Sequence, residues 1–372
     1  MNVLLVCEFG NLNGAERSLL STIDQLNGAV NYSAVVPKSG ELTEEFCRRH
    51  IPVYTLDWKS GGSNRSIDDL RKDFSEILQD YKRRTESDFL VHANSLSSSR
   101  MTGPVCRQEQ IPSLGHIRDI IKLSRQTIAD LNCHKYLACV SFATKAYHVN
   151  QGLDEKKAVV LHNGVDISVF YPSKDKKTNA PLKVGTAGQI SLRKGMDVFI
   201  QAAEILEQRG IQLQYEIAGS RQSSKQETIE LENKLIQSAA AFPDGRFSLK
   251  GQMPDLANWL RSLDIYVHTA RQEPLGRVLL EAAATGLPVV ATDIGGTKEI
   301  FCQTDSNAKS AILIPTDDAQ TAATAIEKLV FDIELRNQLG KQVREIALTR
   351  FSVQQASKNL LNLYNSVIQR LP

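Results

Sequence analysis

The sequence lacks several features that would each indicate a particular class of protein. No apolar run approaches the roughly 20 residues that a membrane-spanning helix requires, and the formal net charge is only +2. Without a basic excess, a general nucleic-acid-binding surface is not expected. The six cysteines form no CxxC pair and no cluster with histidines at zinc spacing. We therefore expect neither a disulfide framework nor a metal site.

We also expect no secretion signal at the start of the sequence. The segment "MNVLLVCEFG" (1–10) is typical of a strand followed by a loop, because its apolar run is too short for a signal peptide and a glutamate ends it. The scattered thiols fit a reducing compartment. We expect a cytoplasmic protein, and the sequence leaves open whether it contacts the inner face of a membrane.

Short β-branched runs alternate with amphipathic helical segments along the whole chain. Continuous apolar strands that alternate with helices form a parallel sheet covered on both faces, so the predicted fold class is α/β with doubly wound sheets. The strands are predicted at residues 2–7, 32–37, 52–56, 88–93, 112–117, 136–141, 158–162, 182–187, 213–219, 246–251, 264–269, 287–293 and 311–315. The clearest helices are predicted at 15–26, 67–84, 318–331, 334–350 and 352–370.

One stretch interrupts this alternation. Residues 169–184 are rich in Lys, Pro and polar residues and are interpreted as an interdomain linker. A chain of 372 residues also favours two domains over one. Ligands bind such sheets at the carboxyl ends of the strands, so a cleft between two of these edges is the expected site.

Two glutamates in "TARQEPLGRVLLEAAATGLPVV" (269–290) are the first candidates for chemistry. Glu273 follows a predicted strand, and Glu281 lies eight positions later in an apolar run, where a buried carboxylate is costly without a partner. A helix is predicted to begin near Gly276–Arg277, which leaves backbone amides for an anion or for hydroxyl groups. The alternative is a glutamate at a helix N-terminus plus a second glutamate in a structural ion pair. The amides concerned belong to Leu275, Gly276, Arg277 and Val278.

The segment "VGTAGQISLRKGMDVFIQAAEIL" (184–206) is the second candidate. Gly188 and Gly195 permit a tight loop after a strand, and Arg193 and Lys194 lie just before a helix, an arrangement that favours a diphosphate. Neither GxGxxG nor GxxxxGKS is present, so dinucleotide and Walker-type binding are not supported. A solvated basic turn is the alternative.

Three further segments carry weaker signals. Gly14 precedes a helix start, where a ligand could approach the backbone, although the segment alone favours a plain helix entry. His116, Arg118 and Asp119 cluster at a strand end, either as functional or as structural residues. The turn "HNG" (162–164) is explained by its place before the linker.

Together these segments resemble one family over nearly the whole chain. The sequence resembles the retaining glycosyltransferases of the GT-B fold, family four, also called group 1 glycosyl transferases. The pattern of a glutamate, seven residues and a second glutamate is the most specific match. The matching segments are "NGAE" (13–16), "GHIRD" (115–119), "CVSFATK" (139–145), "LHNGVD" (161–166), "GQISLRKG" (188–195), "EPLGRVLLEAAATGLPVVATDIGGTKEI" (273–300) and "AILIP" (311–315).

The resemblance implies an architecture and a set of roles. It implies two Rossmann-like domains facing a central cleft: an acceptor-binding domain at 1–170, a donor-binding domain at 171–351, and a C-terminal helix at 352–372 that packs back on the first domain. The implied catalytic residues are Glu273, Lys194, His116 and Arg193. The implied donor-binding residues are Glu281, Gly14, Gln189, Leu275, Gly276, Arg277 and Val278. The implied acceptor-binding residues are Arg118, Asp119 and Asn13.

In this reading the ribose hydroxyls of a bound donor, and not protein groups, satisfy the buried Glu281. Lys194 would neutralise the leaving diphosphate, and Glu273 would bind the sugar. One position departs from the family pattern, because many relatives have Arg directly after the glycine that is Gly188 here, where this chain has Gln189. Arg193 is the predicted substitute.

The implied function is the retaining, metal-independent transfer of a hexose from a UDP- or GDP-sugar to a hydroxyl acceptor in glycan, glycolipid or small-glycoside biosynthesis. No cofactor is implied, since the nucleotide sugar is a substrate. A GT-B nucleotide-sugar epimerase or hydrolase and a non-catalytic nucleotide-sugar-binding protein are the alternatives. The loops at 8–14, 57–66 and 93–104 would shape the acceptor site. Nearby cations leave a phosphorylated, a lipid-linked and a neutral soluble acceptor all open.

Overall fold

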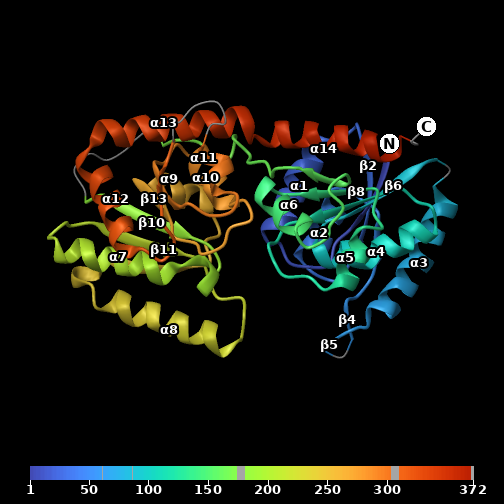
Figure 1. Cartoon of the computed structure of the whole chain (residues 1–372), viewed down its shortest axis with the longest axis horizontal. Coiled ribbons are helices and arrows are strands. Elements are labelled where there is room, and N and C mark those ends of the chain that lie inside the picture. Colours follow the sequence, from blue (N-terminus) through green and yellow to red (C-terminus); the bar gives the residue numbers. More distant parts are fainter. Residues whose placement is uncertain (61, 86, 174–180, 303–309, 370–372) are drawn as a thin grey trace. The chain divides into compact units, whose positions relative to one another are not determined.

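The computed structural model describes residues 1–60, 62–85, 87–173, 181–302 and 310–369. The chain forms two compact units, one of Met1–Gly164 with Val353–Pro372 and one of Val165–Ser352 (Figure 1). Part of the linker predicted at 169–184 lies outside the described residues, because these exclude 174–180. Among the residues that the structure describes, no helix is long and apolar enough to cross a bilayer.

The first unit contains a seven-stranded parallel sheet in the order β3-β2-β1-β6-β7-β8-β9. Its strands are β1 (Asn2–Val6), β2 (Asn31–Val36), β3 (Val53–Thr55), β6 (Phe89–Ala93), β7 (Ser113–Ile117), β8 (Tyr136–Cys139) and β9 (Ala158–Val160). Its helices are α1 (Gly14–Gln25), α2 (Glu41–Arg48), α3 (Ile67–Arg84), α4 (Leu96–Gln108), α5 (Arg125–Leu131), α6 (Phe142–Val149) and α14 (Val353–Ile368). A small antiparallel pair, β4 (Lys59–Ser60) with β5 (Ser63–Asn64), was not predicted.

The central strand β1 shows why this sheet needs helices on both faces. Its side chains alternate between two separate hydrophobic clusters because successive residues of a strand point to opposite faces. Val3 and Leu5 pack with residues of α1, α2 and α14. Leu4 and Val6 pack with residues of α3 and α4. All four side chains are fully buried, which is typical of a strand inside a parallel sheet.

The second unit contains a six-stranded parallel sheet in the order β12-β11-β10-β13-β14-β15. Its strands are β10 (Lys183–Ala187), β11 (Gln214–Ala218), β12 (Phe247–Gly251), β13 (Ile265–His268), β14 (Val289–Thr292) and β15 (Ile312–Ile314). Its helices are α7 (Met196–Gln208), α8 (Gln226–Ala240), α9 (Leu256–Ser262), α10 (Arg277–Ala284), α11 (Thr297–Phe301), α12 (Ala319–Phe331) and α13 (Ile333–Arg350), with short 3₁₀ turns at Leu192–Lys194 and Pro243–Gly245.

Both sheets share one winding pattern, and it fixes where a ligand can bind. Counted within each sheet, the strands of the second unit run 3-2-1-4-5-6, the order of a Rossmann sheet, and the first sheet repeats it with one added strand. The winding reverses between β1 and β6 and between β10 and β13, where ligands bind at the carboxyl ends of the strands. The predicted α/β fold class is confirmed. Each of the predicted strands is present within two residues of its predicted ends.

Helix α14, the last segment of the chain, belongs to the first unit and packs against α1 (Figure 1). Its residue Tyr364 is fully buried, and the hydroxyl oxygen lies 2.7 Å from Nδ1 of the equally buried His92 in β6. Burial, with the nearby charge of Arg118, lowers the pKa of His92 to about 3, so this imidazole is neutral at pH 7. The end of the chain is therefore fixed to the sheet by a buried polar contact as well as by apolar packing.

We expect Tyr364→Phe to lower the free energy of unfolding by about 1–3 kcal/mol, because it leaves a buried ring nitrogen without its hydrogen-bond partner. Urea denaturation followed by circular dichroism measures this change. The matched control is Tyr147→Phe in α6, since that side chain is 37% exposed. Equal stability of the two variants would show that the Tyr364–His92 contact does not hold the helix.

Candidate active site

Lys194 and Glu273, both predicted site residues, meet at the reversal point of the second sheet. Lys194 follows β10 and Glu273 follows β13, and these two strands are neighbours. The Lys194 Nζ atom donates to Glu273 Oε2 at 2.5 Å, although 79 positions separate the two residues in sequence. Both side chains are largely buried, with 15% and 6% of their surface exposed. This position is where the winding pattern predicts a ligand.

His268, the last residue of β13, is a second partner of Glu273. Its Nε2 atom lies 2.9 Å from the same oxygen, Oε2. Burial alone would raise the pKa of Glu273, but Lys194 and His268 together hold it well below its ordinary value. Burial lowers the pKa of His268, so a neutral ring donates its Nε2 proton to the carboxylate. Glu273 is therefore a fixed anion with one of its oxygens already bonded twice.

Two glycines let the surrounding backbone approach closely. At Gly195 (φ +62°) a Cβ atom would lie 1.9 Å from the carbonyl oxygen of Thr269, and at Gly295 (φ +54°) 2.0 Å from that of Glu273. Neither approach is open to a residue with a side chain, and both φ values favour glycine. The loop after β10 and the loop after β13 are thus brought together at Lys194 and Glu273.

Arg271 fixes the loop that carries Lys194, and sequence reasoning missed this role. Its guanidinium donates to the carbonyl oxygen of Leu192 at 2.6 Å and to both carboxylate oxygens of Asp197 at 2.9 and 2.7 Å. Its backbone N–H donates to the carbonyl oxygen of Arg193 at 2.9 Å. Arg271 lies within the segment 269–290, two residues before Glu273, and a cation at the carboxyl end of a predicted strand was the available signal.

Glu281 requires a correction. It is buried, with 2% of its surface exposed, as predicted. The expectation that a ligand and not the protein satisfies it is wrong, because Arg277 binds its Oε1 through Nε at 2.7 Å and through Nη2 at 2.5 Å. The two residues are four apart on α10, which places them on one helix face. The structural ion pair was the alternative reading, and a contact of Glu281 with ribose stays a prediction.

The remaining predicted donor-binding residues surround this pair. Helix α10 begins at Arg277 after Gly276, whose φ is +101°, so the predicted helix start is confirmed. Its first-turn amides have no acceptor within the helix, and among these residues Leu275 is buried. Gln189 and Arg193 are both half-buried in the loop after β10. Their contacts with a diphosphate, like those of Leu275, Gly276, Arg277 and Val278, stay predictions.

In the first unit, His116 and Arg118 form a buried polar cluster at the end of β7. Arg118 donates to the side chains of Asn94 at 2.7 Å and Asn163 at 2.8 Å, and its Nη2 lies 3.1 Å from His116 Nδ1. A guanidinium can only donate, so Nδ1 of His116 is the acceptor. Burial and the charge of Arg118 lower the pKa of His116 well below its usual value. The neutral ring therefore carries its proton on Nε2, a buried atom without a hydrogen-bond partner among the described residues.

The other predicted residues of this unit lie around the same cluster. Asn13 and Gly14 begin α1, and Glu16 in its first turn is buried with Oε2 unpartnered in the described part of the chain. Burial raises the pKa of Glu16, and the charge of Arg118 opposes this shift. Asp119 is exposed, and its carbonyl oxygen lies 2.8 Å from His148 Nε2. Contacts of Arg118, Asp119 and Asn13 with an acceptor stay predictions.

Comparison with known proteins identifies the family. Residues 170–346 match the family model described as Glycosyl transferases group 1. The second unit belongs to the group 1 glycosyl transferases. The predicted GT-B architecture of two parallel-sheet domains agrees with the solved structure of Anabaena Alr3699/HepE in complex with UDP and glucose, at a TM-score of 0.81 and 20% identity over 98% of this chain and 99% of that chain.

Two relatives illustrate the range of the family. The D-inositol 3-phosphate glycosyltransferase of Paenarthrobacter aurescens is 32% identical over 51% of this chain and 47% of its own length. The lipopolysaccharide core biosynthesis mannosyltransferase LpsB of Rhizobium meliloti is 30% identical over 58% of this chain and 63% of its own length. The chain thus spans about half the length of the first of these curated relatives.

We expect Glu273→Gln to lower the stability of the second unit in a pH-dependent way. The pKa of Glu273 is lowered in the folded state, so its contribution is complete above the ordinary value of 4.5 and is lost as the pH falls below it. At pH 7 the variant should lose about 3 kcal/mol, the lower end of the range for breaking a buried ion pair. The difference from the unsubstituted protein should narrow progressively below pH 4.5.

The measurement is urea unfolding in a Trp58→Phe background, where Trp259 of α9 is the sole tryptophan and reports on the second unit. Glu334→Gln, an exposed residue of α13, is the control and should change stability by a few tenths of a kcal/mol at most. A difference between Glu273→Gln and the parent that stays constant down to pH 3 would contradict the charge-dependent role of Glu273.

Proposed function

We propose that the protein is a retaining glycosyltransferase that moves a hexose from a UDP- or GDP-sugar to a hydroxyl acceptor. The observation that carries this proposal is the buried Lys194–Glu273 pair, 2.5 Å apart, at the reversal point of the second sheet. A cation and a sugar-binding carboxylate at that point suit a diphosphate joined to a sugar. The group 1 family match covers the same residues.

In the proposed reaction, an acceptor hydroxyl oxygen forms a bond to the anomeric carbon of the donor sugar. The bond from that carbon to the diphosphate breaks, and the nucleoside diphosphate leaves with the electron pair. The acceptor's proton moves to an oxygen of the leaving phosphate, on the same face of the sugar, so the configuration is retained. Catalysis then depends mainly on positioning and on stabilising the charge of the leaving group.

Lys194 stabilises the leaving diphosphate. An ammonium has three N–H donors, and Glu273 takes one of them, which leaves two for phosphate oxygens. Fixed in place by Glu273, the ammonium supplies positive charge where charge accumulates, so we propose that transfer needs no metal ion. The first-turn amides of α10 and the side chain of Arg193 add further donors for the diphosphate and the sugar.

Glu273 of the second unit orients the sugar hydroxyls. The Oε1 atom of Glu273 accepts from a hydroxyl near the reacting carbon, while Oε2 remains with Lys194 and His268. In the first unit the unpartnered Nε2–H of His116 offers a donor to a substrate hydroxyl. Glu281, already paired with Arg277, binds the ribose through a hydroxyl that donates to its carboxylate.

Known relatives support the donor class and vary in what they transfer. The Anabaena structure is a complex with UDP and glucose, and the Rhizobium relative is a mannosyltransferase. We propose a nucleoside-diphosphate hexose as the donor and a glycan, glycolipid or small hydroxylated molecule as the acceptor. We further propose that the reaction takes place in the cytoplasm, with the inner membrane surface as the place of contact where the acceptor is a lipid.

A panel of UDP- and GDP-sugars tests the donor, because a donor at a hundred times its Kd stabilises the folded protein by about 2.7 kcal/mol. With the donor that gives the largest thermal shift, we expect Lys194→Ala to lower turnover by about 10²- to 10³-fold, the loss typical of removing one charge-stabilising donor. The assay follows nucleoside diphosphate release with acceptor present and absent.

Lys250→Ala is the matched control, since Lys250 lies in β12, two strands from β10, and pairs with Glu216 at 3.2 Å. It should keep turnover within about twofold. Near-normal turnover of Lys194→Ala would contradict the assigned role. Release of free sugar, or of an epimer, at the full rate without acceptor would contradict transfer as the function.

The substitution of Arg193 for the missing Arg at position 189 is tested separately. We expect Arg193→Ala to weaken donor binding by roughly tenfold, as the loss of a charge-assisted hydrogen bond does. Gln189→Arg should change it by less than about threefold. Calorimetric titration with the nucleoside diphosphate measures both. The opposite pattern, with no loss for Arg193→Ala and a large gain for Gln189→Arg, would overturn the idea.

A further inference from the structure

The first unit contains a cavity of about 620 Å³ that the residues discussed so far do not line. It lies at the carboxyl edge of the sheet, since its lining residues follow β1, β2, β3, β6 and β7. It includes Glu8 after β1 and Ser97 after β6, and the winding of this sheet reverses between these two strands. Both its place and its size are typical of a small-molecule site.

The walls of the cavity combine apolar surface with hydroxyl groups. Phe9 and Ile121 are 47% and 46% exposed and contribute apolar surface, together with Trp58. Ser97 and Ser124 contribute hydroxyls. An apolar lining with a few polar groups at defined positions suits a small ligand with both an apolar face and hydrogen-bonding groups, such as a sugar or another polyol.

The positive and negative charges of the cavity lining do not balance once ion pairs with residues outside the lining are taken into account. The charged lining residues are Lys59, Arg65, Arg100, Lys122, Glu8 and Asp57. Arg65 is paired with Asp73 at 2.7 Å. Burial raises the pKa of Glu8, and hydrogen bonds from Ser97 and Ser95 oppose this shift only in part. The raised pKa weakens the attraction of the Glu8 carboxyl group for the cations nearby. Arg100, Lys122 and Lys59 then face the two acids Glu8 and Asp57, so the cations of the lining exceed its acids by one.

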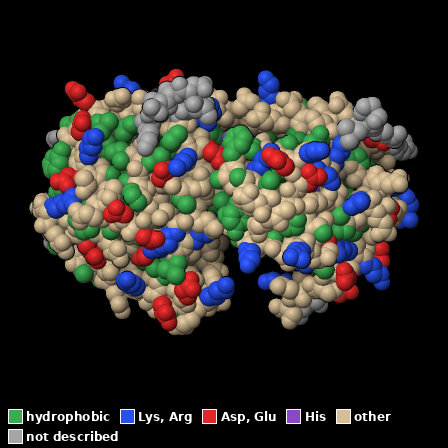
Figure 2. All heavy atoms as spheres, in the orientation of Figure 1, with side chains coloured by type: hydrophobic (Ala, Val, Ile, Leu, Met, Phe, Trp, Pro, Cys, Tyr) green, Lys and Arg blue, Asp and Glu red, His purple; other side chains and the backbone are tan. Residues whose placement is uncertain are grey.

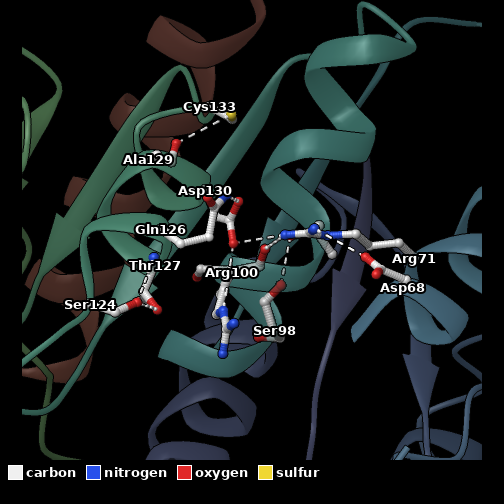
Figure 3. A network of polar contacts seen from close by, with 12 residues as sticks. Asp68, Arg71, Ser98, Arg100, Ser124, Gln126, Thr127, Ala129, Asp130 and Cys133 are labelled. Atoms are coloured by element: carbon white, nitrogen blue, oxygen red, sulfur yellow. Dashed lines mark hydrogen bonds and ion pairs between the residues drawn. The ribbon is translucent and has the colours of Figure 1, made fainter. Parts of the chain in front are cut away.

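Arg100 is one of two arginines that share a single buried carboxylate, Asp130 of α5 (Figure 3). Arg71 Nη2 lies 2.8 Å from Asp130 Oδ2, while Arg100 Nε lies 3.5 Å from the same oxygen. Neither of these two contacts with Oδ2 has hydrogen-bonding geometry. Gln126 donates to the other carboxylate oxygen of Asp130, Oδ1, at 2.9 Å. The second acid near Arg71 is Asp68, 3.6 Å away and 88% exposed, so it contributes little.

Asp130 can thus neutralise only one of the two guanidinium groups, and Arg71 is the nearer. Arg71 also donates to the carbonyl oxygen of Arg100 at 3.2 Å, which holds the start of α4 in place. The side chain of Arg100 is 39% exposed and lines the cavity. With Nε turned to Asp130, the two Nη groups of its planar guanidinium can bind an anion bidentately.

We propose that this cavity is the acceptor site, and that the acceptor is a hydroxylated molecule carrying a phosphate monoester, bound by Arg100 and Lys122. The proposal rests on the proposed function, since it names the substrate class for the acceptor of that transfer. A phosphate monoester carries nearly two negative charges at pH 7, which matches two cations that lack full neutralisation. The apolar walls and the serine hydroxyls then contact the polyol.

The cavity draws on all three loops predicted to shape the acceptor site, through Phe9, Trp58 and Ser97. It also uses a segment that was not predicted, residues 121–124 after β7. The sequence gave no reason to select Arg100, because its pairing with Asp130 depends on the packing of α4 against α5.

The test is calorimetric titration of the full chain with a hexose 6-phosphate and with the free hexose, in the presence of saturating nucleoside diphosphate. We expect the phosphorylated sugar to bind at least tenfold more tightly. Arg100→Gln should weaken its binding by roughly tenfold or more, and Lys122→Gln, which touches no charged partner in the described chain, by several-fold. Lys156→Gln, an exposed lysine outside the cavity, should change it by less than about twofold.

A second arm identifies the source of the phosphate. Sedimentation with vesicles that contain phosphatidylinositol 4-phosphate, whose headgroup carries a phosphate monoester, and with phosphatidylcholine vesicles measures binding to a lipid phosphate headgroup. One outcome is that the chain binds the vesicles with the phosphorylated headgroup, that Arg100→Gln abolishes this binding, and that hexose 6-phosphate does not bind. That outcome supports a lipid-linked acceptor at the same site. Equal affinity for hexose 6-phosphate and for the free hexose, together with vesicle binding that Arg100→Gln leaves unchanged, would overturn the proposal.

Failure of the proposed function can be distinguished from failure of the acceptor proposal. If the protein binds a nucleotide sugar and transfers it, but with no preference for phosphorylated acceptors, only the acceptor proposal fails. If no nucleotide sugar binds, the function itself fails. Urea unfolding followed by the fluorescence of Trp58, which lies in the same unit as Arg100, shows whether Arg100→Gln is folded, and Lys122→Gln tests the site without touching the Asp130 cluster.

Discussion

The second unit depends on one buried charge, the carboxylate of Glu273. Burying a carboxylate costs several kcal/mol unless charged and hydrogen-bonding partners compensate it. Lys194 and His268 provide that compensation on a single oxygen. To do so, the loops after β10 and β13 must meet, and Gly195 lets their backbones approach to a distance that a side chain would prevent. Gly295, in the loop after β14, permits an equally close approach to the backbone of Glu273. The pair therefore defines both the local fold and the proposed donor site.

The first unit solves the opposite problem, that of a half-buried cation. Arg118 is surrounded mainly by neutral acceptors from Asn94 and Asn163, and burial lowers its pKa to about 10. The same cation keeps His116 neutral and fixes its tautomer, so that the ring offers an N–H group and not a lone pair. In both units, an internal polar network prepares a donor or an acceptor before any substrate arrives, which reduces the cost of ordering it during binding.

Local sequence patterns predicted the elements well, because each strand of a doubly wound sheet carries a continuous apolar run and each helix an amphipathic repeat. Strands β4 and β5 were not predicted because each has only two residues and none of the four is apolar, so the sequence shows no hydrophobic pattern there. The Glu281–Arg277 pair could have been found, since the spacing of four on a predicted helix is a local signal. Its omission led to the wrong expectation that only a ligand satisfies Glu281.

Contacts between distant segments could not be derived in this way. The role of Arg271 depends on the strand order, which brings a turn at 192–195 beside a loop more than seventy residues later. Local patterns selected Lys194 and Glu273 as candidates and the family resemblance implied their roles, but neither identified the residues that hold them. Those residues bind other protein groups, and their identity follows from the geometry of the loop that they support.

The charge balance of the whole chain likewise conceals the distribution that matters for an acceptor. Acidic and basic side chains are intermingled over the visible surface in Figure 2, in keeping with a net charge of +2. Within the first unit, however, the carboxylate of Asp130 faces two guanidinium groups, and the one that lines the cavity is the more distant. Since an interaction between charges depends on separation and on burial, local pairing decides the potential that a small ligand meets. A nearly neutral protein can thus still present a cationic cavity.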